Sequence, residues 1–304
     1  MKKLSIEEQL YLRMQILDVV QELTEQQGGF LTWQEITSFR LNGIPRPLAG
    51  QRGIFNPHYF DHTLSINSSF KGGYRDEIGP DGLLHYDFET GDPRAGANRK
   101  LREALKDQVP IILFRNPLPN IYLPIIPAYV VSEDLQKGFV KVAAGEEFRA
   151  VHLSAPDSVN KRYVEQLVKR RVHQPEFRAR VISAYSTSCA ICRLKHRELL
   201  DAAHIIPDSQ PHSTAEVSNG LSLCKIHHAA YDRNFLGIDP DYKVHINEEL
   251  LVERDGPMLK HGLQEMHGIT LNVPHKKAER PNPQALEERF ATFSKLGTPS
   301  AHTA

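Results

Sequence analysis

The hydrophobic pattern at the start of the chain predicts two helices. Over residues 4–26 apolar side chains recur at helical spacing, and a pair of glycines follows. A shorter run of the same kind covers residues 31–41. Ser5 and Thr32 stand near the starts of these runs, and each has a glutamate three residues later, the spacing of a helix-capping box. We therefore expect both segments to be helical, with Trp33 in the core.

From residue 44 to residue 142 the pattern changes to short apolar runs separated by proline, glycine, asparagine and aspartate, which is typical of strands. Strands are expected at residues 64–67, 82–89, 109–115, 120–131 and 138–143, with one helix at residues 97–107. This order predicts an α+β domain with a mixed or largely antiparallel, barrel-like sheet and accompanying helices.

The rest of the chain is interpreted as a linker followed by helices and short strands. The linker covers residues 143–160, and two helices are expected after it, at 161–172 and 176–188. A strand is expected at 199–206, and a turn at 218–220 leads into a second strand and a helix near residue 224. The remaining elements are a hairpin turning at 239–241, a strand at 269–274 and a last helix at 283–296. The predicted domains are 1–150 (front domain), 151–175 (linker and basic helix), 176–296 (second domain) and 297–304 (tail, expected to be disordered).

Composition and charge qualify this division. The 304 residues, of which 40% are hydrophobic, suffice for two domains with a core each. The formal net charge is zero, which by itself argues against a nucleic-acid partner. Residues 160–200, however, carry ten lysines and arginines against three glutamates. Such a run is often only a solvated helix face, but it also suits a phosphate backbone, and the candidates for DNA contact are Arg170, Arg171, Arg178 and Arg180.

All three cysteines fall within one short stretch. Cys189 and Cys192 form a C-x-x-C pair, and Cys224 with His227 repeats the same gap as C-x-x-H. Two such pairs are typical of a structural, tetrahedral Zn²⁺ site. The alternatives are a redox pair or three unrelated buried cysteines, but the charged residues that follow Cys192 do not suit a thioredoxin-like context.

The cysteine count and the apolar runs also bear on location. With every cysteine assigned to zinc, none is left for a disulfide, which fits a reducing compartment. The chain starts without an apolar signal region, and no run approaches the roughly 18 apolar residues of a membrane span. We therefore expect a soluble cytoplasmic protein without a membrane partner.

Four further polar residues lie among the zinc pairs. His204 is on the predicted strand, Asn219 follows it by fifteen residues, and His228 follows Asn219 by nine. His228 and Asp232 are four residues apart on a helix, so they project from one face and suit one divalent cation. Taken singly, each has an ordinary explanation as a buried histidine, a turn residue or a solvated carboxylate. Their joint spacing favours metal-dependent chemistry.

These residues, from about Tyr185 to Ile246, resemble the HNH or ββα-metal endonucleases. The resemblance implies a zinc-stabilised ββα-metal fold in which His204 is the general base and Asn219 fixes the loop and the orientation of that base. It implies that His228 binds the catalytic metal, Mg²⁺ or Mn²⁺, and that Asp232 stands where many members have a further ligand.

One departure concerns the residue before the general base. Many members have an acidic residue or histidine there, and this chain has Ala203. The nearest substitute is Asp201, two residues back on the same strand face. Either Asp201 completes the catalytic metal site or that site has fewer protein ligands.

The front domain resembles the N-terminal part of bacterial predicted restriction endonucleases, whose modules are similar to PUA and SRA domains that read modified bases. The similarity rests on the segments QRGIF, YRD, YDFETGDP, NRKLREA and VPIILF in that order. It implies a pocket for an extruded base. The candidate base contacts are Tyr74, Asp76, Tyr86, Phe88 and Asp92, with Arg52 and Arg75 for phosphate, although Tyr86 and Phe88 also fit a sheet core and Asp92 fits a turn.

Together these features predict a metal-dependent DNA endonuclease that acts in restriction of foreign or modified double-stranded DNA. A homodimer is expected if both strands are cut, since two nicks need two active sites. Two alternatives are a zinc-containing DNA-binding module without cleavage, which Ala203 favours, and an HNH nuclease of recombination or mobile-element excision.

Overall fold

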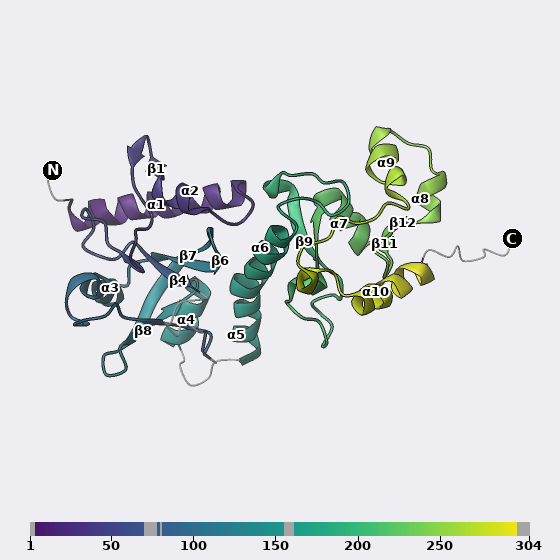
Figure 1. Cartoon of the computed structure of the whole chain (residues 1–304). Helices are drawn as coiled ribbons and strands as arrows, with labels where there is room; N and C mark the ends of the chain where they lie inside the picture. Colours follow the sequence, from purple (N-terminus) through teal and green to yellow (C-terminus); the bar gives the residue numbers. More distant parts are fainter. Residues whose placement is uncertain (1–3, 70–77, 80, 155–160, 297–304) are drawn as a thin grey trace. The chain divides into compact units, whose positions relative to one another are not determined.

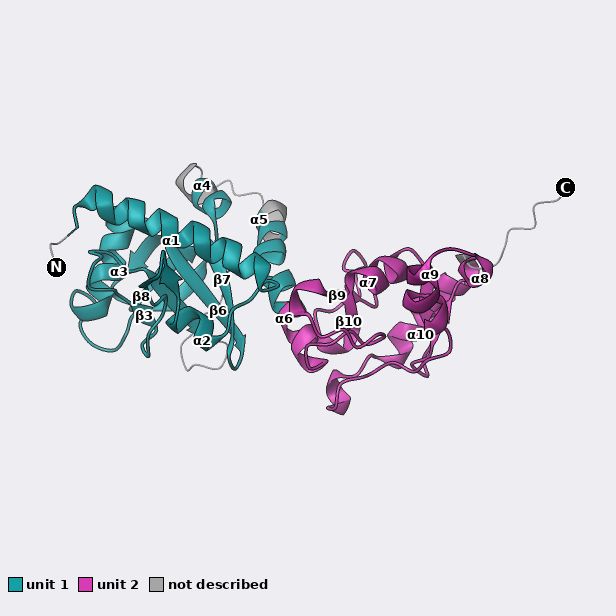
Figure 2. Cartoon of the chain, turned by 90° about the horizontal axis from the view of Figure 1, so that it is seen from above, with its two compact units in different colours: residues 1–176 teal, residues 177–304 magenta. Residues whose placement is uncertain are grey.

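The computed structural model describes residues 4–69, 78–79, 81–154 and 161–296. The chain divides into two compact units, Met1–Glu176 and Phe177–Ala304 (Figure 2). In sequence order, the elements of the first unit are α1 (Ile6–Gln26), α2 (Trp33–Thr37), β1 (Arg40–Leu41), β2 (Ile44–Pro45), β3 (Ile54–Phe55), β4 (Ser65–Ser69), β5 (Leu84–Asp87), α3 (Gly96–Lys106), β6 (Ile111–Leu118), β7 (Ile121–Asp134), β8 (Phe139–Ala143), α4 (Glu146–Ser154) and α5 (Lys161–Val168).

Both predicted N-terminal helices are present, and both start with a capping box. The Ser5 hydroxyl accepts from the backbone N–H of Glu8 at 3.1 Å, and the Glu8 carboxylate accepts from the backbone N–H of Ser5 at 2.7 Å. Thr32 caps α2 in the same way. The second helix is shorter than predicted because the chain turns after Thr37 into β1, which pairs with β2.

The first unit is built on a six-stranded sheet with the order β3-β4-β6-β7-β8-β5. The pairing of β4 with β6 is parallel, and the other pairings in this sheet are antiparallel. Register shifts interrupt the β6–β7 and β7–β8 pairings. Such irregularities increase the bend of a strand, and this sheet curls into a half-barrel (Figure 1). The predicted α+β domain with a barrel-like sheet is confirmed.

The segment predicted as a linker, residues 143–160, contains a helix in the part that the structure describes, which ends at residue 154. Residues 146–154 form α4, and Phe148 is fully buried in the core of the first unit. Val164 and Leu167 of α5 belong to the same core. For residues 146–154 the linker prediction is corrected to a helix, because it weighed the polar residues and missed the aromatic side chain that packs in the core.

The two helices predicted on either side of Pro175 are one continuous helical run. α5 passes through a π-helical turn (Lys169–His173) into α6 (Gln174–Ala184), and the backbone N–H of Gln174 donates to Lys169, five residues back. A proline lacks an N–H and crowds the carbonyl four residues earlier, so it would normally end a helix. The wider π turn immediately before it accommodates the proline ring without ending the run.

A buried ion pair anchors the last residue of the first unit. Arg115 on β6 donates to Glu176 at 3.0 Å and to the Ser68 hydroxyl at 2.7 Å. The two charged side chains are only 9% and 8% exposed. Because ionised groups lose hydration on burial, each member of the pair needs the other.

The elements of the second unit follow α6 and are β9 (Leu200–His204), β10 (Gly220–Cys224), α7 (Lys225–Asp232), β11 (Leu236–Ile238), β12 (Val244–Ile246), α8 (Glu248–Val252), α9 (Pro257–Gly262) and α10 (Pro283–Leu296). β9 pairs with β10 and β11 with β12, both antiparallel. The predicted hairpin at residues 239–241 and the last helix are confirmed, whereas the strand expected at 269–274 is reduced to a single bridge between Lys243 and Thr270.

Among the described residues, no helix combines the length and apolar character needed to cross a bilayer.

We expect the Arg115–Glu176 pair to be costly to break and cheap to replace. Glu176→Leu alone leaves the Arg115 charge buried without its partner and should lower the free energy of unfolding of the first unit by about 3–5 kcal/mol. The double variant Arg115→Met, Glu176→Leu should recover most of that loss, since it leaves no unpaired charge. Urea unfolding of the wild type, Glu176→Leu, Arg115→Met and the double variant measures both effects, and a double variant as unstable as the sum of the two singles would contradict this account.

Candidate nuclease site and metal centre

The β9–β10 pair carries the candidate site on a regular two-stranded frame. His204 lies opposite Gly220, and Asp201 lies opposite Leu223, with no register shift between them. Successive side chains of a strand alternate between its faces, so Asp201 and His204 point to opposite sides of the pair. The chain then enters α7 directly after Cys224, which gives the strand, strand, helix order of a ββα unit.

Four side chains come together at the end of this frame. Cys189, Cys192, Cys224 and His227 have their ligand atoms within 4.8 Å of one another, and in the described part of the chain they are the one group of three or more such residues that meets this spacing. The sulfurs of Cys192 and Cys224 are 3.9 Å apart. Tetrahedral zinc thiolates have sulfurs about 3.8 Å apart, because each Zn–S bond is about 2.3 Å. The group could therefore bind zinc.

His227 is oriented for this role from both sides of its ring. Its Nδ1 atom faces the sulfurs of Cys224 at 3.1 Å and Cys189 at 3.5 Å, and its Nε2 atom donates to the carbonyl of Gly262 at 2.8 Å. Metal-binding histidines commonly give their second ring N–H to such an acceptor. Sequence reasoning missed Gly262, since nothing in its local sequence marks a carbonyl 35 residues away as a partner of His227.

The electrostatics of the group suit a cation. Hydrogen bonds from Cys192 and Cys224 lower the pKa of the Cys189 thiol, which favours thiolate. Burial alone would lower the pKa of His227, but the sulfurs of Cys189 and Cys224 that face it raise that pKa to about 10. A metal ion at this position would replace the proton that the histidine otherwise holds.

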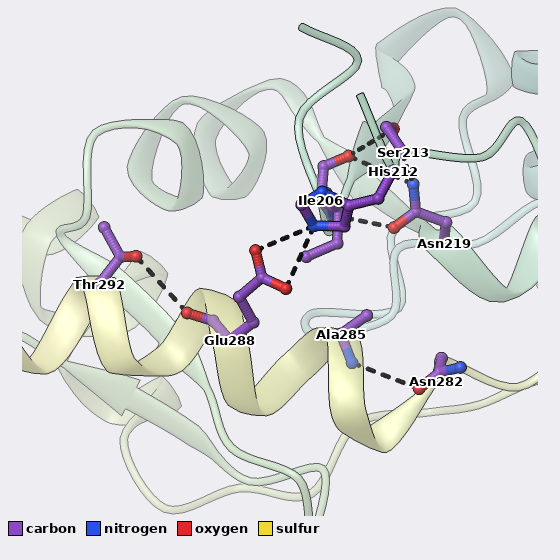
Figure 3. Close-up of polar contacts among 8 residues, drawn as sticks. All are labelled: Ile206, His212, Ser213, Asn219, Asn282, Ala285, Glu288 and Thr292. Atoms are coloured by element: carbon purple, nitrogen blue, oxygen red, sulfur yellow. Dashed lines mark hydrogen bonds and ion pairs between the residues drawn. The ribbon is translucent and has the colours of Figure 1, made fainter. Parts of the chain in front are cut away.

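Asn219 holds the loop that follows β9 (Figure 3). Its side chain is 5% exposed, and its Oδ1 atom accepts from the backbone N–H of Ile206 at 2.9 Å. Its Nδ2 atom donates to the carbonyls of Ile206 and Thr214 and to the Ser213 hydroxyl. The loop is also joined to α10 by an ion pair from His212 to Glu288 at 3.1 Å. One buried amide thus determines the path of the chain immediately after His204.

His228 lies between two carboxylates, and each contacts a different ring nitrogen. Nδ1 is 3.5 Å from Asp201, and Nε2 is 3.3 Å from Asp232. A neutral imidazole has one lone pair for a metal. Asp201 and Asp232 therefore face different nitrogens of the His228 ring. The assignment of these residues to one catalytic cation stays a prediction.

Asp201 is surrounded by positive and hydrogen-bonding groups. Lys225 approaches its carboxylate at 2.6 Å, and the Arg178 side chain approaches it at 3.5 Å. Burial would raise the pKa of Asp201, but the hydrogen bonds from His228 and Lys225 together with the charges of Lys225 and Arg178 lower it well below its ordinary value. Asp201 is thus a carboxylate at neutral pH.

The arginines predicted to contact DNA mostly have partners within their own units. Arg170 and Arg171 both bind Glu147, at 3.0 and 2.7 Å. Arg178 donates to the carbonyls of Arg197 and Leu200 as well as to Asp201, which holds α6 against β9. Arg180, also on α6, is half-buried. DNA contact by these residues stays a prediction. Arg178 also has a role within the fold, since its hydrogen bonds join α6 to the start of β9.

The residues of the front domain that were predicted to contact a base or a phosphate fall into three groups: some lie outside the described residues, some are buried in the core and some lie at the surface. Tyr74, Arg75 and Asp76 lie outside the described residues. Tyr86 and Phe88 are 5% and 6% exposed and belong to the core of the first unit, as the alternative interpretation has it. Asp92 accepts from the backbone N–H of Arg94 in an exposed turn. Arg52 lines a surface pocket of about 410 Å³ with Gln51, Phe55, Asn56 and Lys100 among its neighbours.

Comparison with known proteins assigns the class of the second unit. Residues 189–239 match the model of the HNH endonuclease family, so this unit contains an HNH endonuclease domain. No curated protein matches the chain.

Three solved structures show weak similarity over larger parts of the chain. They are the modification-dependent TagI restriction endonuclease (15% identity, 76% of this chain and 81% of that one, TM-score 0.33), Arabidopsis thaliana SUVH6 in complex with SAM (19%, 54% and 29%, 0.25) and the type IV phosphorothioation-dependent restriction endonuclease ScoMcrA (14%, 55% and 49%, 0.21).

We expect the four-ligand group to hold about one zinc ion per chain. His227→Asn should weaken zinc binding by at least about 100-fold and destabilise the second unit, because the remaining thiolates cannot close a tetrahedral site. His228→Asn changes the adjacent residue and should keep the zinc. Metal content after dialysis, with thermal unfolding of both variants, measures the difference, and equal zinc loss in the two would contradict the assignment.

Proposed function

We propose that this protein is a DNA endonuclease that hydrolyses phosphodiester bonds and acts in restriction of foreign DNA. The observation that carries the proposal is the ββα frame of residues 200–232, which lies within the HNH endonuclease match. This frame carries His204 on β9 and His228 on α7, next to His227 of the Cys₃His group. Zinc in that group is structural, since four protein ligands leave no open position.

His204 is the proposed general base. Hydrolysis of a phosphodiester needs a water deprotonated in line with the leaving oxygen, and neutral imidazole suits that task near neutral pH. His204 is half-buried at the end of β9, where the Asn219-braced loop begins. The side chain thus combines access to solvent with a fixed backbone.

His228 and Asp232 are the proposed ligands of a catalytic Mg²⁺ or Mn²⁺. The Nε2 atom of His228 and the Asp232 carboxylate face each other at 3.3 Å from successive turns of α7. A hard cation commonly keeps several waters and takes one or two protein ligands together with substrate phosphate, so this small set fits. When bound, the cation would neutralise charge that develops on the phosphate and the leaving oxygen.

Asp201 is proposed to act on His228 and not on the metal. Its contact with Nδ1 fixes the ring tautomer that leaves Nε2 available, and Lys225 and Arg178 balance its charge. This arrangement accounts for the missing metal ligand at residue 203. Many HNH enzymes have an acidic residue or histidine there, whereas this chain has Ala203, whose side chain is fully buried in the core of the unit. The site then has fewer protein ligands than many HNH enzymes.

A DNA-binding module without cleavage is the second candidate function, and the ligand-poor metal site favours it. The front unit is proposed to bind DNA in either case, with Arg52 in its pocket as one contact. Recognition of a modified base there rests on the sequence resemblance.

The first test is cleavage of matched plasmids, one unmodified and the others carrying methylated, hydroxymethylated or glucosylated bases, with Mg²⁺ or Mn²⁺. Cutting should be lost in His204→Ala by at least about 100-fold, because a general base contributes roughly 10²–10⁴ to the rate. His275→Ala removes an exposed imidazole elsewhere in the second unit and should cut normally. Cutting confined to one modified plasmid would support modification dependence, and binding without cutting would favour the second candidate.

The assignment of Asp201 has a test that does not depend on activity. Asparagine can still accept a hydrogen bond from the Nδ1–H of His228, so Asp201→Asn should keep Mn²⁺ affinity within about threefold, whereas Asp201→Ala should lower it about 10- to 100-fold. Asp232→Asn removes a ligand charge and should weaken binding at least about 10-fold. Mn²⁺ titrations followed by electron paramagnetic resonance give these values, and equal losses in Asp201→Asn and Asp232→Asn would make Asp201 a ligand.

A further inference from the structure

An aromatic ring from α6 lies directly on the proposed general base. Phe177 and His204 are stacked, with ring centroids 4.1 Å apart and planes inclined by 16°. Phe177 is 3% exposed and belongs to the core of the second unit. The phenylalanine precedes the segment that matches the HNH family model, so neither the motif nor the match assigns it a role.

The opposite strand is shaped to admit this ring. Gly220 lies directly across from His204 on β10. A Cβ atom at residue 220 would come within 2.9 Å of the Phe177 ring and within 2.4 Å of Val181, closer than real Cβ atoms approach. The backbone of Gly220 is extended, with φ of −129°, so the glycine is needed for the space above it and not for an unusual turn.

The helix that carries Phe177 is also attached to the strand pair. The neighbouring residue, Arg178, bonds to Asp201 and to the carbonyl of Leu200 at the start of β9. One turn further along α6, Val181 is fully buried, and the Tyr185 hydroxyl donates to the carbonyl of Gly220 at 3.2 Å. Arg178 and Tyr185, the residue that follows α6, thus attach this part of the chain to both strands of the frame.

We infer that Phe177 is a positioning residue for His204. The Phe177 ring fixes the orientation of the imidazole, and therefore the direction from which the imidazole nitrogen accepts a proton. This inference rests on the proposed function. A flat ring stacked face to face blocks rotation of the imidazole about its outer bond, while a flexible aliphatic side chain of similar volume leaves that rotation open. Reacting groups held out of alignment by about 1 Å can cost roughly 100-fold in rate.

The test compares Phe177→Leu with Phe293→Leu in the full-length protein. Phe293 is another buried phenylalanine of the same unit, stacked on Phe290, and serves as the matched control for lost aromatic packing. Phe177→Leu should lower kcat for plasmid cutting by about 10- to 100-fold with KM little changed. Phe293→Leu should leave kcat near the wild-type value at a similar loss of thermal stability.

Ring-current shifts provide a readout that needs no cutting. In protein labelled at histidine, with the His204 signals assigned by their loss in His204→Asn, the ring protons of His204 should lie upfield in the wild type and in Phe293→Leu, and should move downfield in Phe177→Leu. If the wild type cuts no DNA, the proposed function fails, and the chemical shifts still decide whether Phe177 holds the His204 ring.

A second pair of variants approaches the ring from the other strand. Val181→Ala removes the nearer obstacle, so Gly220→Ala in that background presses mainly on Phe177. The double variant should reproduce the low kcat and the downfield shift of Phe177→Leu, and Val181→Ala alone should not. Unchanged His204 shifts in Phe177→Leu, or an equal fall in kcat for Phe177→Leu and Phe293→Leu, would overturn the inference.

Discussion

The convergence of Cys189, Cys192, Cys224 and His227 is the constraint on which the second unit depends. The first two ligands come from the turn before β9, the third ends β10, and the fourth lies on the first turn of α7. One ion would therefore join the turn before β9 and the end of β10 to the helix that follows. His228 is the next residue after His227 and points about 100° away around α7, so fixing the zinc ligand also fixes the direction of the proposed catalytic ligand. A metal bound by these four ligands would thereby orient the proposed catalytic ligand without binding it.

The remaining freedom of the site is removed by contacts between distant segments. Asn219 holds the chain after His204 through backbone atoms of Ile206 and Thr214, and Phe177 covers the His204 ring. Both side chains are buried, while His204 and His228 are only half-buried. The two histidines that are proposed to act in the reaction thus stay partly exposed, while buried residues hold the chain around them.

What the sequence could predict follows from the range of each interaction. Capping boxes, the C-x-x-C and C-x-x-H pairs and the i, i+4 spacing of His228 and Asp232 are local, so the pattern alone indicated the helices, the four-ligand group and the ββα order. The stack of Phe177 on His204 and the bond from His227 to Gly262 join residues 27 and 35 positions apart without any repeating pattern. The separation of Asp201 from Asp232 depends on ring orientation, which spacing does not specify. The same limitation applies to the buried Tyr86 and Phe88, since an aromatic pair at period two suits a core and a pocket equally.

The order of residues on α6 links these long-range contacts within a single helical turn. Glu176 binds Arg115 in the first unit, Phe177 stacks on His204, and Arg178 binds Asp201. Three consecutive side chains of one helix therefore serve the anchoring of the front sheet, the proposed base and the carboxylate beside the proposed metal ligand. Because backbone hydrogen bonds make a helical turn stiff, a change in the backbone at Glu176 would alter the next two positions as well.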